Sequence, residues 1–213
     1  MNEGMISGIV VRVEDKSSGF PAAIVTLAGE TDRNGKPLVF FEHVRLTGQI
    51  AQQALGLQPG EAVLFDRAAV EQMIWNDQGT NEPRSQIAIR GRSFVRLQGV
   101  HTRRMGEHLI LEGAMNIFSL RGRLAKNAET RRTGPFGEVT EVIVTVNLPV
   151  RPTATETRPH YLKVEAWRQS NLKGTGKGTL VITQVLVKTD MKVIEGKKRY
   201  FTVLEERSSN VAA

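Results

Sequence analysis

The stretch that decides the fold reads HYLKVEAWR and covers residues 160–168. An extended chain places every second side chain on the same face, so Leu162, Val164 and Ala166 form one apolar face. The opposite face carries Tyr161, Lys163, Glu165 and Trp167. Two aromatic planes with a cation between them are what unpaired bases beside a phosphate backbone require. The pattern predicts a half-buried β-strand with a functional face, or an ordinary amphipathic strand whose aromatic rings pack beneath a loop.

The composition limits the class of protein. The chain has 213 residues, of which 40% are hydrophobic, which is ordinary for one large or two small globular domains. It has no cysteine, which excludes disulfides and thiolate chemistry and favours a cytoplasmic location. The sequence contains neither an N-terminal apolar run typical of a signal peptide nor a segment suited to crossing a bilayer. We therefore expect no membrane partner.

The positive charge is confined to the second half of the chain. Residues 1–112 hold 12 Lys and Arg against 13 Asp and Glu, whereas residues 113–213 hold 17 against 9, so the net charges are −1 and +8. A basic half without a basic amphipathic helix favours a polyanion over a membrane surface as its partner. A charged surface that serves only solubility is the alternative.

The first half predicts five strands with one helix after the third. The strands are expected at residues 5–13, 22–28, 38–46, 62–75 and 86–97, and the helix at residues 50–57. This is the element order of an OB-fold, a five-stranded Greek-key barrel that commonly binds oligonucleotides or oligosaccharides. Residues 99–113, which mix Gly, His and Arg with a short apolar strip at 108–111, are interpreted as a connector.

The second half repeats this order. Strands are expected at residues 117–124, 139–147, 160–168, 179–191 and 198–205, with a turn at 131–137 and a loop at 151–159. Residues 24–27 correspond to 143–146 and residues 41–46 to 161–166, which indicates an internal duplication. The glycines of residues 169–178 predict a loop where the first half has its helix. The predicted fold class is all-β, with tandem OB-folds at 1–98 and 114–207, a connector at 99–113 and a short tail at 208–213.

With these residues identified, the chain resembles the bacterial single-stranded DNA-binding protein (SSB) family. The second half follows that family's opening pattern and its next two strands, through Met115, Asn116, Leu120, Gly122, Arg123, Leu124, Glu129, Arg131, Thr133, Gly137, Val139, Val146, Asn147 and Tyr161 to Trp167. The first half matches more weakly, through residues 43–46, Gly48, residues 59–61 and Trp75. Two such halves are similar to the branch that carries two OB-folds per chain and dimerises to present four.

The resemblance implies sequence-independent binding of single-stranded DNA by a specialised SSB paralogue of DNA replication, repair or recombination, acting as a homodimer. It implies stacking by Phe41, Trp75, Tyr161 and Trp167, and phosphate contacts by residues that include Arg131 and Lys163. The complete candidate DNA-binding set is Phe41, Arg45, Trp75, Arg121, Arg123, Arg131, Arg132, Arg151, Tyr161, Lys163, Trp167, Arg168, Met191 and Lys192.

The chain also departs from the family pattern. Thr47, Val150 and Met191 stand where the family often has further aromatics, so we expect fewer stacked bases and more charge-dependent binding. The sequence ends without the acidic, apolar tip by which the family recruits repair enzymes, which puts such recruitment in doubt.

The sequence favours no enzyme, cofactor or metal site. Residues 174–179 do not form a phosphate-binding P-loop, because Asn171 stands at the position of its first glycine and Gly178 at the position of its hydroxyl. The four histidines do not cluster. Two alternatives to DNA binding remain open. One is an RNA-binding OB-fold protein, and the other is an assembly module in which Tyr161 and Trp167 anchor a protein interface.

Overall fold

The computed structural model describes residues 2–33, 35–76, 79, 81–132, 137–149, 155–167, 170–194 and 196–211, with the side chains of 192, 194, 197 and 199 excepted. Contacts divide the chain into two units. The first barrel unit comprises Gly4–Val70 and Ala88–Ile117, and the second barrel unit comprises Met1–Glu3, Glu71–Ile87 and Phe118–Ala213. The predicted domain boundaries near residues 98, 113 and 207 stay a prediction.

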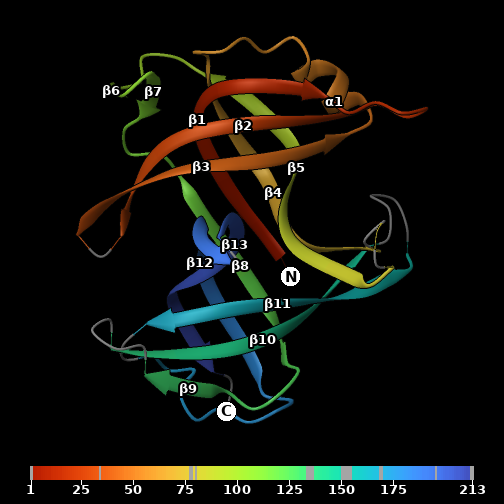
Figure 1. Cartoon of the computed structure of the whole chain (residues 1–213), viewed down its shortest axis with the longest axis vertical. Helices are drawn as coiled ribbons and strands as arrows, with labels where there is room; N and C mark the ends of the chain where they lie inside the picture. The colour runs from red at the N-terminus through yellow and green to blue at the C-terminus, as the bar shows by residue number, and fades with distance from the viewer. Residues whose placement is uncertain are drawn as a thin grey trace. The chain divides into compact units, whose positions relative to one another are not determined.

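The first barrel unit contains a closed five-stranded barrel with one short helix (Figure 1). Its elements are β1 (Asn2–Asp15), β2 (Ala22–Arg33), β3 (Lys36–Thr47), α1 (Gln49–Ala54), β4 (Ala62–Asn76) and β5 (Pro83–Leu97). β1 pairs antiparallel with both β2 and β4, and β3 pairs parallel with β5 through Val44 and Ile89. The strand order β1-β2-β3-β5-β4 therefore returns to β1, which is the predicted OB-fold.

The helix of the first unit is shorter than the predicted range of 50–57. Gly48 precedes it with a φ of 67°, a left-handed conformation that glycine adopts without steric cost. Ala51 and Ala54 are buried, so their small side chains form the contact face of the helix. The sequence predicted this element correctly in kind and place, and the structure ends it after six residues.

The segment interpreted as a connector forms a β-hairpin. β6 (Thr102–Met105) pairs with β7 (His108–Leu111), and β7 continues the sheet by one parallel bridge between Leu111 and Gly29 of β2. Ile110 and Leu111 are buried, which gives the apolar strip of this segment a structural role. The hairpin belongs to the first barrel unit.

The second barrel unit repeats the closed arrangement. Its further strands are β8 (Asn116–Leu124), β9 (Glu129–Arg132), β10 (Glu138–Pro149), β11 (Thr157–Trp167), β12 (Leu180–Ile194) and β13 (Lys197–Val211). β8 pairs with both β10 and β12, and β11 pairs parallel with β13 through Val164 and Leu204. A Cβ added to Gly122 would lie 2.1 Å from the carbonyl oxygen of Thr145, so barrel closure at β8 requires glycine.

Three segments of the second unit bear on the predictions. Residues 170–178 contain turns and no helix, as the glycine content predicted. Residues 129–132, which overlap the predicted turn, form β9, which pairs antiparallel with β10. The hydroxyls of Thr130 and Thr140 also hydrogen-bond across this pair at 2.9 Å. Residues 208–211, predicted as the start of a tail, continue β13, where Val211 pairs with Val181.

The strand registers refine the predicted duplication. Val44 and Val164 occupy equivalent parallel bridges and lie 164 − 44 = 120 residues apart. Their antiparallel neighbours are Val25 and Val142, which lie 142 − 25 = 117 residues apart. The predicted match of residue 24 with residue 143, an offset of 119, is therefore wrong by two residues. A slip of two keeps every side chain on the same face, so apolar alternation does not detect it.

Candidate nucleic-acid interface

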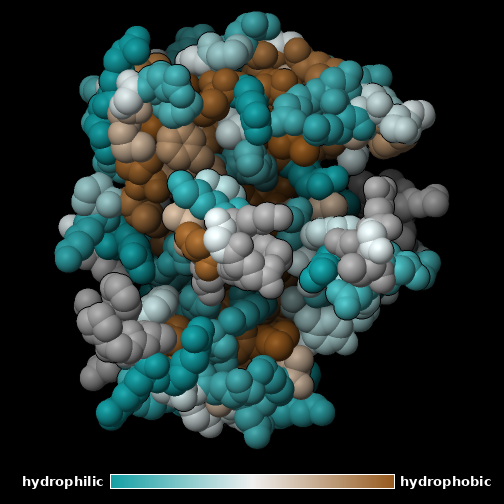
Figure 2. All heavy atoms as spheres, in the orientation of Figure 1, coloured by the Kyte–Doolittle hydropathy of each residue, from teal (hydrophilic) through white to brown (hydrophobic). Residues whose placement is uncertain are grey.

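The outer surface of β10 and β11 brings the residues of the decisive stretch together. Leu162, Val164 and Ala166 are fully buried in the barrel, which places the alternate residues outside. On this outer surface Glu141 lies opposite Glu165, Ile143 opposite Lys163, and Thr145 opposite Tyr161. We call this surface the β10–β11 face; it consists of Glu141, Ile143, Thr145, Tyr161, Lys163, Glu165 and Trp167. Hydrophilic side chains predominate over β9, β10 and β11 in the view of Figure 2.

The two aromatic residues of this face differ in their exposure. The Tyr161 side chain is 48% exposed, so its ring is available for stacking. Trp167 is half-buried and lies opposite the buried Val139, and its indole N–H has no hydrogen-bond partner among the described residues. Neither ring is sealed inside the barrel, as binding to bases requires.

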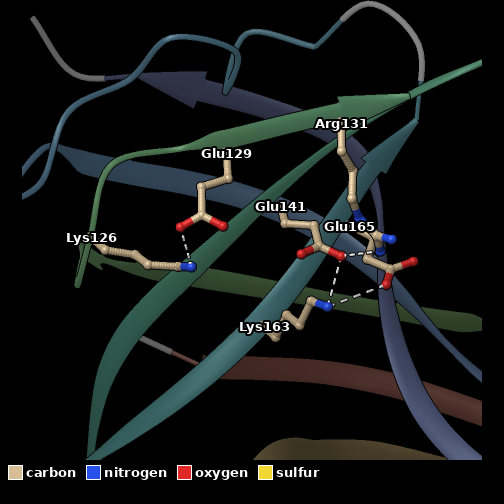
Figure 3. Close-up of polar contacts among 6 residues, drawn as sticks. All are labelled: Lys126, Glu129, Arg131, Glu141, Lys163 and Glu165. Carbon is tan, nitrogen blue, oxygen red and sulfur yellow. Dashed lines mark hydrogen bonds and ion pairs between the residues drawn. The ribbon is translucent and has the colours of Figure 1, made fainter. Parts of the chain in front are cut away.

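A row of three carboxylates crosses the strands beside these rings. Glu129 pairs with Glu141 across β9 and β10, and Glu141 pairs with Glu165 across β10 and β11. Like charges placed directly opposite each other destabilise a sheet unless cations compensate them. Three cations do so: Lys126 contacts Glu129 at 2.5 Å, Arg131 contacts Glu141, and Lys163 contacts Glu141 at 2.8 Å and Glu165 at 3.7 Å (Figure 3).

Glu141 is the centre of this network. Both Arg131 and Lys163 converge on the same oxygen, Oε1 (Figure 3). Burial raises the pKa of Glu141, but hydrogen bonds from Lys163 and Arg131 outweigh this effect and hold the pKa below its ordinary value. Glu141 is therefore a carboxylate at neutral pH, and two of the predicted phosphate-binding cations are already ion-paired in the free protein.

This pKa shift predicts a pH-dependent contribution of Glu141 to stability. A carboxyl whose pKa is lowered by folding stabilises above its unfolded pKa of about 4.3, and that stability is lost as the pH falls through the folded-state pKa. We expect Glu141→Gln to reduce the free energy of unfolding by ~1 kcal/mol at pH 7 and by less at pH 3. Urea unfolding of both proteins at the two pH values measures the difference. A gap that does not shrink between pH 7 and pH 3 would contradict the assignment.

The other candidate arginines of the second unit that the structure describes are exposed. Arg123 donates from Nη1 to the carbonyl oxygen of Gly178 at 2.8 Å, which fixes its guanidinium beside a turn. Arg132 lies 4.0 Å from Glu138, and its side chain is almost completely exposed. Arg121 is exposed on β8, and Met191 is exposed near the end of β12. These positions stay predicted DNA contacts.

Trp75 groups with the second barrel unit, although its strand begins in the first. The end of β4 belongs to residues 71–87, which contact the second barrel. The backbone N–H of Gln72 donates to His160 Nδ1 at 2.9 Å, and the backbone N–H of Tyr161 donates to Gln72 Oε1 at 3.2 Å. The Trp75 side chain is 43% exposed. The structure thus assigns three of the four predicted stacking residues to one unit.

The first barrel unit presents less of the predicted site. Phe41 and Arg45 are half-buried on β3. The Phe41 and His108 rings form an edge-type contact, with centroids 5.1 Å apart and planes at 65°. His108 begins β7, which is bridged to β2. Part of the Phe41 ring is therefore occupied by a neighbouring side chain.

Four predicted positions are not located by the structure. Val150, Arg151 and Arg168 lie outside the described residues, and the side chain of Lys192 is also not described. Among the described residues, no group of three or more side chains is arranged to hold a metal ion. Within the same part of the chain, none of the helices has the length and apolar character needed to cross a membrane.

Sequence reasoning missed Glu141 and Gln72. Glu141 lies with Ile143 and Thr145 on the outer face of β10. This position is visible in the sequence, but the role of Glu141 follows only once β9 and β11 are placed beside β10. Gln72 lies 89 residues from Tyr161, and no sequence pattern connects the two. Both are consequences of tertiary pairing.

Two closed barrels with this strand order define an OB-fold protein. No family model matches the chain. It is 29% identical over 201 residues to the single-stranded DNA-binding protein of Thermus thermophilus, which covers 88% of this chain and 73% of that protein. It is 28% identical over 194 residues to the corresponding Thermus aquaticus protein, covering 85% of this chain and 72% of that one.

A solved structure agrees with these sequence matches. The crystal structure of the wild-type Thermus aquaticus single-stranded DNA-binding protein superimposes with a TM-score of 0.74 over 100% of this chain and 93% of that chain, at 22% identity. That likeness establishes the fold. The chain is therefore similar in sequence to single-stranded DNA-binding proteins over most of its length, and it shares with this solved structure a fold of two OB barrels in one chain.

Proposed function

We propose that this chain binds single-stranded DNA without sequence preference, and that the β10–β11 face is its main contact surface. The observation that carries the proposal is the outward presentation of Tyr161 and Lys163 on a closed OB barrel, with Trp167 on the same face. Curated relatives that match most of the chain are named for this activity.

Two physical effects produce such binding. Each base presents a π-face, so stacking on Tyr161 contributes roughly 1–3 kcal/mol whatever the base. Lysine and arginine attract the phosphates and release condensed counterions, which makes the affinity fall with salt. Neither effect reads base identity, so the proposal is sequence-independent binding by a non-enzymatic protein.

The charge distribution supports a dominant role for the second half of the chain. Its net charge of +8 contrasts with −1 for residues 1–112. Trp75 belongs to the second barrel unit as well, so rings and cations are concentrated there. Phe41, in the first unit, already has His108 against its ring. We infer that the first barrel contributes less to affinity.

The assembly and the pathway are further parts of the proposal. We infer a homodimer that presents four barrels, and a role as a specialised paralogue in DNA replication, repair or recombination. Sedimentation equilibrium at micromolar concentration tests the dimer: the expected mass is twice the 23.6 kDa of one chain. A mass of one chain would refute this part and leave the DNA-binding proposal in place.

Competition binding tests the proposed function. A labelled oligo(dT) is displaced by unlabelled single-stranded DNA of several sequences, by matched RNA and by the matched duplex. We expect all single-stranded DNAs to compete within a few-fold of one another, and duplex DNA to compete poorly. Stronger competition by RNA would assign the chain to RNA binding instead, and failure of every nucleic acid to bind would favour a protein-interaction role.

The tryptophans provide a test of where stacking occurs. We expect Trp167→Ala to reduce oligo(dT) affinity more than Trp75→Ala, because Trp167 shares its strand face with Tyr161 and Lys163. Fluorescence anisotropy of a labelled oligo measures both variants. Since Trp167 is half-buried, thermal melting must confirm that its variant is folded at the assay temperature. The reverse order of losses would place the main stacking surface at the β4–β5 hairpin.

A further inference from the structure

In the absence of DNA, two of the proposed phosphate-binding cations are already paired with a carboxylate of the protein. Lys163 on the β10–β11 face and Arg131 on the adjacent strand β9 both donate to Glu141 Oε1. Their side chains are still about half exposed, whereas the Glu141 side chain is only 16% exposed. The cations can therefore reach a strand lying on the surface while the carboxylate stays beneath them.

We propose that Glu141 is a built-in competitor of the DNA backbone, which holds Arg131 and Lys163 in place and sets the affinity of the β10–β11 face for single strands. This inference rests on the proposed function. A phosphodiester and a carboxylate both use anionic oxygens to accept hydrogen bonds from guanidinium and ammonium groups. Each phosphate that reaches these cations must displace, or share with, the oxygen of Glu141.

The neighbouring charges make that exchange costly. Glu165 lies directly opposite Glu141 on β11, and Glu129 lies directly opposite it on β9. When Arg131 and Lys163 turn toward phosphates, Glu141 faces two carboxylates with less compensation, in a site where it is poorly hydrated. Like charges at this spacing repel, so part of the gain from each phosphate contact is lost.

Glu141 is singled out from the other two carboxylates by its contacts. Glu129 is paired with Lys126, a cation outside the predicted DNA-binding set. Glu165 contacts Lys163 at 3.7 Å, which is longer than the 2.8 Å from Lys163 to Glu141. Glu141 alone of the three contacts both Arg131 and Lys163 in the ion pairs that the structure describes. Its removal therefore releases two phosphate-binding groups at once.

The test is oligo(dT) affinity of the full chain with Glu141→Gln, which keeps the shape and removes the charge. We expect binding to tighten by roughly 3- to 10-fold at low salt, the effect of one removed anion close to the phosphates. In the wild-type protein, DNA binding leaves the Glu141 carboxylate without its cations, so this carboxylate takes up counterions and offsets part of the release from DNA. The variant lacks this uptake. Its slope of log affinity against log salt should therefore be steeper by up to about 0.7 for each of the two cations. A purely structural role for Glu141 would not steepen that slope.

Two controls define the effect. Glu61→Gln removes an equivalent anion from the first barrel unit, where Glu61 pairs with Arg96 at 2.9 Å, and it should leave affinity and slope unchanged. In a Lys163→Ala background, Glu141→Gln should give a smaller gain, because one of the released cations is gone. A gain that is the same in both backgrounds would refute the competition.

The outcomes separate this inference from the function beneath it. If wild-type protein binds oligo(dT) and folded Glu141→Gln binds equally or more weakly with an unchanged slope, the inference is overturned and the proposed function stands. If neither protein binds oligo(dT), the proposed function itself fails. Should Glu141→Gln not fold, Glu141→Asp shortens the side chain and weakens both ion pairs, and it must then give a smaller gain of the same sign or refute the inference.

Discussion

Tyr161→Ala is expected to weaken oligo(dT) binding by roughly 1–3 kcal/mol, or about 5- to 150-fold, the cost of losing one base-stacking ring. Tyr161 is the most exposed ring on the β10–β11 face, with 48% of its side chain accessible. Its neighbours in the strand, His160 and Leu162, are buried and hold its backbone in place. Fluorescence anisotropy at low salt measures the loss.

The conservative change Tyr161→Phe is the matched control, because it retains the ring and removes the hydroxyl. We expect it to bind within a few-fold of the wild-type protein. Equal, large losses for the alanine and phenylalanine variants would show that the hydroxyl and not the ring is important. Binding of Tyr161→Ala at the wild-type level would remove this surface from the DNA-binding site.

The second large effect is expected from charge. Replacing Arg131, Arg132 and Lys163 together by alanine should weaken oligo(dT) binding by on the order of 10- to 100-fold at low salt and lower the salt slope by about 1–2. Three free cations would lower it by about 2 at the single-strand value of 0.7 each. The pairing of Arg131 and Lys163 with Glu141 makes the smaller end of this range the expected one.

A matched triple variant in the first half of the chain provides the comparison. Arg12, Arg33 and Lys36 lie in the half with a net charge of −1, and Arg12 already pairs with Glu14 at 2.9 Å. Alanine at these three positions should change affinity and slope little. Equal effects of the two triple variants would refute the asymmetry between the halves.

Local patterns predicted the barrels because their strands are half-buried. In β11 the strict alternation of Tyr161, Lys163 and Glu165 with buried apolar residues specifies both the strand and its outer face. The glycine-rich residues 170–178 were likewise recognisable as a helix-free loop. Both features depend only on neighbours in the chain.

Other features depend on partners that are distant in the chain. The hairpin at β6 and β7 has an unremarkable sequence, and it is a structural element because Leu111 bridges to Gly29 of β2. Trp75 appeared to belong to the first barrel, since the hydrogen bonds of Gln72 to residues 160 and 161 leave no trace in sequence. Such pairings become visible only when the strands are placed.

The ion pairs of the site were the least predictable feature. From sequence alone, Arg131 and Lys163 are assigned as phosphate contacts, with no ion-pair partner predicted for either. Their cross-strand positions bring both within contact of Glu141, which changes the expected affinity and its salt dependence. The residue that sets the strength of a binding surface can therefore be one that carries the opposite charge.

Titration with oligo(dT) at a series of salt concentrations, followed by tryptophan fluorescence, tests the central claim most directly. We predict that the emission of the two tryptophans is quenched as bases stack, and that log affinity falls linearly with log salt with the same slope for unrelated single-stranded sequences. Unchanged emission together with an affinity that does not depend on salt would contradict binding of single strands at a surface of aromatic rings and cations.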